Sequence, residues 1–157
     1  MGSDPHPGSL AEALADCDLV HVAAHGTHRG DNPLFSNLLL DEGIVVAHEL
    51  DVGPVRASHV VLSACEVGRA SHSPGDQPLG LTAAFLAAGV ACVVAPVAPV
   101  GDRLAATVMA RYHAGLIAGL DAATALSAAV NGTPAAGAYV CFGSSWRACI
   151  TGADGDS

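Results

Sequence analysis

Apolar and polar positions follow one another along the chain in blocks that predict strands and helices in turn. Residues 19–26, LVHVAAHG, and residues 59–65, HVVLSAC, are short and almost continuously apolar. Such runs are typical of strands that a sheet buries on both faces. A third run of this kind covers residues 91–97. Helical patterns separate and follow these runs, so the sequence predicts an α/β domain with a mainly parallel sheet.

The predicted helices begin and end at residues with known capping preferences. Residues 9–12 have the Ser-x-x-Glu capping-box pattern, and the helix that they start extends to about residue 16. A second helix covers residues 79–88 and ends at Gly89. Asp102 is expected to cap the longest helix, and Asp121 a further helix that ends near residue 130. The longest helix places these apolar residues on one face: Leu104, Val108, Met109, Tyr112 and Leu116.

Residues 38–46 predict a β-hairpin inserted between the strands of the parallel sheet. Two apolar triplets flank Asp41, Glu42 and Gly43, and a three-residue connection with glycine last suits a left-handed turn. A last short strand is predicted over residues 139–142. Loops rich in glycine and polar residues are expected at residues 27–33 and 68–78.

Residues 79–100 form an uncharged run that is long enough to cross a membrane. Gly89 lies in its middle, and Pro96 and Pro99 lie near its end. We therefore expect a buried helix, a glycine stop and a buried strand, with a membrane-spanning helix as the alternative.

Composition narrows the possible classes of partner. The 157 residues are 51% hydrophobic and 13% charged, with six arginines, no lysine and fifteen acids, which gives a formal charge of −9. A nucleic-acid surface needs clustered basic residues, so nucleic acid is not an expected partner. The length predicts one domain. We expect that domain at residues 9–150, with a flexible segment at residues 1–8 and a disordered tail at residues 151–157.

The cysteines and histidines do not have the spacing of a metal site. Five cysteines without a CxxC pair, behind a polar first segment, predict free thiols and a cytoplasmic location. The eight histidines lack metal-ligand spacing, so a structural zinc is not expected. Residues 75–82 resemble a phosphate-binding loop, but Leu81 replaces its lysine, which argues against nucleotide binding.

His25 and Cys65 end two of the predicted parallel strands, and functional groups gather at that edge of such sheets. A thiolate can attack a carbonyl, and a nearby imidazole can activate the thiol and then protonate the leaving amine. Small neighbours such as Gly26 and Ala64 leave backbone N–H groups open to an oxyanion. The alternative is a buried structural thiol at Cys65 and a satisfied strand-end histidine at His25.

The other candidate residues have simpler interpretations. Cys92 and Cys141 are expected in the core, and Cys17 and Cys149 flank predicted elements. His21 is expected to pack in mid-strand. A solvated or capping role is expected for His28, His48, His59, His72 and His113. Five acids near the expected crevice could favour a basic substrate residue, with surface solvation as the alternative: Asp16, Asp18, Asp31, Glu66 and Asp76.

Several motifs in order resemble the CHAT domain, a caspase-like module often found behind tetratricopeptide repeats. They are VHVAAHG at residues 20–26, DNPLFSNLLLDEG at 31–43, VVLSACEVG at 60–68, GDQPLGLTAAFLAAGVACVVAPV at 75–97 and GDRLAATVMARYHAGLIAG at 101–119. The likeness covers about residues 18–143.

The resemblance implies the caspase-like αβα sandwich and the chemistry of a cysteine endopeptidase. By that likeness His25 is the catalytic histidine and Cys65 the nucleophile, and the backbone N–H groups of Gly26 and Cys65 form the oxyanion site. The implied substrate is a protein or peptide, and no cofactor is implied. Regulation by tetratricopeptide-repeat or sensor modules in a larger protein is expected.

The resemblance also leaves two functions open. The family fold has two strands and a helix before the histidine strand, and this chain starts too late for them, so we expect the carboxyl-terminal part of the domain. The retained His25 and Cys65 favour a peptidase. The missing strands favour an inactive CHAT module that serves as a protein-interaction scaffold.

Overall fold

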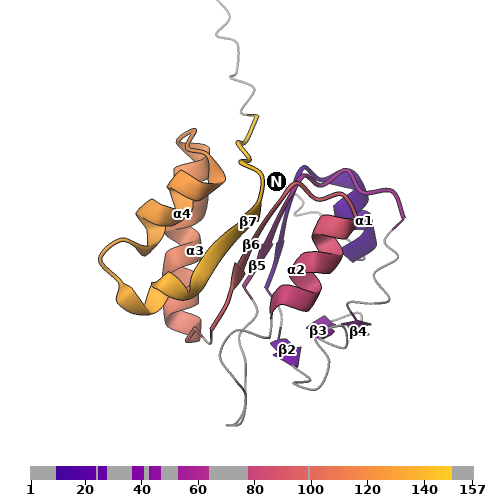
Figure 1. The fold of residues 1–157 in the computed structure, drawn as a ribbon, viewed down its shortest axis with the longest axis horizontal. Coiled ribbons are helices and arrows are strands. Elements are labelled where there is room, and N and C mark those ends of the chain that lie inside the picture. The colour runs from indigo at the N-terminus through magenta and orange to yellow at the C-terminus, as the bar shows by residue number, and fades with distance from the viewer. Residues whose placement is uncertain are drawn as a thin grey trace, which may run out of the picture.

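A four-stranded mixed sheet forms the centre of the protein (Figure 1). The computed structural model describes residues 10–23, 25–27, 37–40, 43–46, 53–63, 78–98 and 100–149. The strand order is β1-β5-β6-β7, in which β1 (Leu19–Val22), β5 (His59–Leu62) and β6 (Cys92–Pro96) are parallel. β7 (Tyr139–Gly143) pairs antiparallel with β6. The predicted α/β class and mainly parallel sheet are therefore confirmed.

A small antiparallel sheet contains the predicted hairpin. It consists of β2 (His25–Thr27), β3 (Asn37–Leu40) and β4 (Gly43–Val46), in that order. Leu40 pairs with Gly43, so two residues connect the hairpin strands and not the three expected. Figure 1 shows this sheet beyond one end of the main sheet.

The single strand predicted over residues 19–26 is in fact two strands. β1 pairs with β5 as far as Val22, whereas His25 already pairs with Leu39 of β3 in the other sheet. The apolar run is continuous because Ala23 and Ala24 directly follow β1, and hydrophobicity alone does not reveal a change of pairing partner.

Helices cover both faces of the main sheet (Figure 1). α1 (Leu10–Asp16) and α2 (Pro78–Ala87) lie on one face. α3 (Asp102–Ile117), α4 (Ala122–Val130) and the 3-10 helix Pro134–Ala138 lie on the other. Successive residues of β5 point to opposite faces of the sheet. Val60 packs in the core between the sheet and helices α1 and α2, and Val61 packs in the core between the sheet and helices α3 and α4. The result is an αβα sandwich.

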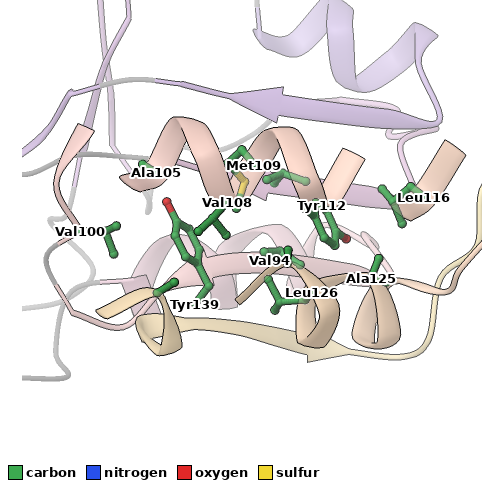
Figure 2. Close-up of a cluster of buried hydrophobic side chains, with 14 of the residues drawn as sticks. Val94, Val100, Ala105, Val108, Met109, Tyr112, Leu116, Ala125, Leu126 and Tyr139 are labelled. Atoms are coloured by element: carbon green, nitrogen blue, oxygen red, sulfur yellow. The ribbon is translucent and has the colours of Figure 1, made fainter. Parts of the chain in front are cut away.

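The long helix buries most of the face that its sequence predicts. Figure 2 shows Val108, Met109 and Tyr112 of α3 in the core between this helix and Val94 of β6. Leu104 of the predicted face is only half-buried. Burial of this stripe attaches α3 to the sheet through apolar contact.

One of the two predicted aspartate caps is correct. Asp121 accepts a hydrogen bond from the Thr124 backbone N–H, 3.1 Å away, and caps α4. Asp102 does not cap α3, because the helix starts one residue earlier than expected. Gly101 is the N-cap, and its carbonyl accepts the Ala105 N–H at 2.9 Å.

Residues 79–100 divide between a helix and a strand. α2 is followed by Gly89, whose φ of +104° is in the left-handed region, and the chain then enters β6. Among the helices that the structure describes, none is both long and apolar enough to cross a membrane.

A buried histidine joins the central strand to α3. His59 is fully buried, and its Nδ1–H donates to the Cys92 carbonyl at 3.0 Å. The Tyr112 hydroxyl donates to His59 Nε2 at 2.6 Å. The Trp146 ring lies 4.7 Å from the His59 ring, centroid to centroid. The solvated or capping role expected for His59 is therefore wrong, because β5 is a central strand covered by helices.

Some predicted segments lie outside the described residues. They are the flexible segment at residues 1–8, the capping residue Ser9, most of the loops at residues 27–33 and 68–78, and the tail at residues 151–157.

Replacement of Tyr112 by Phe should leave His59 Nε2 buried without a hydrogen-bond donor. We expect the free energy of unfolding to fall by about 1–3 kcal/mol, the cost of an unsatisfied buried polar group. Urea unfolding followed by circular dichroism measures the change. Ile117→Ala on the same helix is the control, since this side chain is 73% exposed and should contribute within about 0.5 kcal/mol. Equal costs in the two variants would contradict the role given to the hydroxyl.

Replacement of Gly143 by Ala should destabilise the sheet edge. Gly143 has a φ of +89°, and an added Cβ would overlap the Ala91 carbonyl oxygen and press on the Leu86 side chain. Strain and overpacking together should cost at least about 2 kcal/mol in a thermal or urea unfolding experiment. Gly137→Ala is the matched control, because its φ is ordinary and nothing lies near the added Cβ. A Gly143→Ala variant as stable as this control would refute the steric argument.

Candidate functional site

The two strands that lead to the predicted catalytic residues are adjacent and parallel. Leu19 pairs with His59 and Val22 pairs with Leu62, so each residue of β1 lies opposite the residue forty positions later. The ladder ends with the Ser63 N–H, which donates to the Val22 carbonyl at 3.0 Å. The expected parallel arrangement is therefore confirmed for β1 and β5, whereas His25 itself belongs to β2 of the other sheet.

The reactive groups themselves stay a prediction. The backbone of His25 and Gly26 belongs to β2, where they pair with Leu39 and Leu38, and their side-chain surroundings are not described. Cys65 lies outside the described residues, which stop at Ser63 on this segment. The oxyanion role predicted for Gly26 and Cys65 stays a prediction for the same reason.

A cavity of about 410 Å³ lies between this edge of the sheet and α3. Its sheet side includes Ala23 and Ser63, the residues directly after β1 and β5. Its helix side is lined by small or flexible apolar residues of α3: Ala105, Ala106, Met109 and Ala110. Its other polar lining residues are His21, His113 and Asp102.

A chain of hydrogen bonds among three residues that line the cavity joins the sheet to the helix. His21 Nε2 lies 2.8 Å from Ser63 Oγ, and His21 Nδ1 lies 2.9 Å from His113 Nε2. The two imidazole rings stack with centroids 4.9 Å apart. In one tautomer the Ser63 hydroxyl donates to His21, which donates to His113; in the other both bonds run in reverse. Both nitrogens of His21 are therefore satisfied within the protein.

The environment keeps both of these histidines neutral. Loss of hydration between β1 and α3 lowers the pKa of His21 to about 4, and the neighbouring His113 adds to this shift. Loss of hydration also lowers the pKa of His113. A neutral imidazole pair can donate and accept hydrogen bonds but adds no positive charge to the cavity near pH 7.

Sequence reasoning did not find this cluster. His21 was expected to pack, and it does stack on His113, but it is exposed and not sealed in the sheet. The solvated role expected for His113 is wrong, because the ring is only half-exposed and bonds to His21. Ser63 had no assigned role. The one available signal was a polar His21 in an otherwise apolar strand.

Two of the acids proposed near the crevice lie at the wrong end of the sheet. Asp16 ends α1 and Asp18 directly precedes β1, so both lie at the amino end of that strand. Asp18 forms an exposed ion pair with Arg56, with a nitrogen–oxygen distance of 3.3 Å. Their proposed influence on substrate charge is therefore wrong. Asp31, Glu66 and Asp76 lie outside the described residues.

The remaining cysteines lie as expected from their sequence surroundings. Cys92 is buried and Cys141 half-buried, with their sulfurs 3.4 Å apart, while Cys17 and Cys149 are exposed free thiols. The contact with Cys141 and burial raise the pKa of the Cys92 thiol, so it stays protonated. Within the described part of the chain, no three histidine, cysteine or acidic side chains are placed to hold a metal ion.

The lowered histidine pKa values predict a stability that depends on pH. Below about pH 6.5 the unfolded chain takes up protons that folded His21, His59 and His113 resist, so protonation favours unfolding. The free energy of unfolding should therefore fall as the pH drops from about 6.5 to about 5, and should not gain from these groups above about 6.5. Urea titrations across this window measure the slope. His21→Gln should make it shallower, and an unchanged slope would contradict the pKa assigned to His21.

Comparison with known proteins identifies the family. Residues 1–133 match the CHAT domain, which is most of the chain. A search of curated protein sequences finds no significant match. The matched range contains β1, β5, α3 and the cavity between them. The chain therefore belongs to the CHAT family, a caspase-like peptidase family, and has the caspase-like fold.

Proposed function

We propose that this domain is a cysteine endopeptidase in which Cys65 is the nucleophile and His25 the acid–base catalyst. The observation that carries the proposal is the register of β1 and β5. The last residues paired in this ladder are Val22 and Leu62, and His25 and Cys65 each follow three positions later. Segments that follow neighbouring parallel strands start from the same edge of the sheet, so both residues are expected near that edge.

The proposed reaction passes through an acyl-enzyme. The Cys65 thiol gives its proton to His25 and its sulfur attacks the peptide carbonyl carbon. His25 then protonates the leaving amine as the carbon–nitrogen bond breaks. Water, deprotonated by His25, attacks the thioester, and the proton returns to the released sulfur. The backbone N–H groups of Gly26 and Cys65 are proposed to stabilise the oxyanion of both tetrahedral intermediates.

A peptide acyloxymethyl ketone tests the nucleophile, because a reactive cysteine displaces its acyloxy group to form a stable thioether. We expect Cys65 to react at least about tenfold faster than the exposed Cys17 and Cys149, since its thiolate fraction is raised by the histidine. Peptide mass spectrometry after timed labelling measures the rate at each cysteine. His25→Ala should remove the preference for Cys65.

Two control variants make the labelling result decisive. A Cys17→Ser/Cys149→Ser protein should keep fast labelling and proteolysis, whereas Cys65→Ala should lose peptide cleavage by at least about a thousandfold. Labelling of Cys65 no faster than that of Cys17 would overturn the peptidase proposal. An inactive CHAT module that serves as an interaction scaffold would then be favoured.

A further inference from the structure

The cavity between the sheet edge and α3 lies next to both proposed catalytic residues along the chain. Ala23 precedes His25 by two residues and Ser63 precedes Cys65 by two residues, and both line the cavity. Two residues of extended chain span at most about 7 Å. A peptide held at the Cys65 sulfur is therefore within reach of the cavity.

The cavity has room for an apolar side chain, and its walls suit one. Its volume of about 410 Å³ is near the lower end of small-ligand sites. The helix wall consists of three alanines and Met109, which offer apolar surface and a flexible thioether. An aliphatic side chain entering from the sheet edge would lose contact with water against this wall, which favours binding.

The charges around the cavity disfavour an ionised side chain. Among the described residues that line the cavity, Asp102 alone carries a full charge, and it lies eleven residues before His113 on α3, about 16 Å along the helix. At the histidine end, His21 bonds to both Ser63 and His113, so its ring needs no ligand. A carboxylate there would find no fixed cation among the described lining residues, and an ammonium or guanidinium group would lose hydration far from Asp102.

We propose that this cavity binds an uncharged, mainly apolar substrate side chain such as that of Met or Leu beside the scissile bond. The inference rests on the proposed peptidase function, since that function supplies the peptide. His21 and His113 act as specificity-determining residues, because their mutual hydrogen bond gives this part of the cavity wall a neutral surface. The Ser63 hydroxyl, held by His21, limits how far a side chain can enter.

Equilibrium binding to the Cys65→Ala protein separates this inference from catalysis. Three fluorescent peptides that differ only at one central residue, Met, Glu or Arg, are titrated and followed by anisotropy. We expect the Met peptide to bind about tenfold more tightly than either charged peptide, a difference typical of apolar pockets. Equal or tighter binding of the Glu or Arg peptide would overturn the proposal, and so would absence of binding by all three.

Matched variants on α3 locate the binding site. Ala106 is exposed and lines the cavity, so Ala106→Phe should fill it and weaken Met-peptide binding by about tenfold. Ala114→Phe places the same ring at an exposed position of the same helix outside the cavity, and should leave binding unchanged. Equal effects of the two variants would place the peptide elsewhere and refute the proposal.

A substitution that adds a positive charge to the cavity wall provides a gain-of-function test. His113→Arg should introduce a fixed cation into the cavity wall and raise affinity for the Glu peptide by about tenfold, while the neutral His113→Gln should not. No gain by His113→Arg, in a protein whose circular dichroism matches the parent, would contradict the role given to His113. If peptide preference follows these expectations while Cys65 labelling fails, the cavity binds peptides and the hydrolytic mechanism alone is wrong.

Discussion

The backbone ladder between β1 and β5 is the constraint on which the candidate site depends. It sets residues forty positions apart side by side, from Leu19 and His59 to Val22 and Leu62. Side chains alternate between the two faces of a sheet, so a slip of one residue would turn His21 and Ser63 to opposite faces. The hydrogen bond between them, and the placement of the segments that lead to His25 and Cys65, require this one register.

Two successive residues of α3 connect this helix to two different strands. Tyr112 bonds to His59 of β5, and His113 bonds to His21 of β1. Polar groups in such positions are costly unless paired, and the paired geometry limits how α3 can rotate or slide on the sheet. The apolar stripe around Val108 and Leu116 supplies most of the attraction. Apolar contact therefore holds α3 against the sheet, and the two polar pairs set its position there. The cavity follows from that position.

The order of elements and their types could be predicted from local patterns. The alternation of apolar runs with helical patterns, the Asp121 cap and the hairpin all concern residues close in the chain, and the structure agrees with them. Errors arose where neighbours in space decide. The run over residues 19–26 divides between two sheets, because β1 pairs with β5 whereas His25 pairs with β3. Hydrophobic periodicity reports burial and not the identity of the pairing strand.

The sequence by itself determined the class of fold, the family motifs and the chemical groups on offer, because these depend on residue types and short spacings. Only the tertiary structure decided which of those groups meet. His21 and Ser63 are 42 residues apart, and His21 and His113 are 92 residues apart. Contacts over such distances follow from strand register and helix packing, which many residues set together. No local pattern around any one of these three residues contains that information.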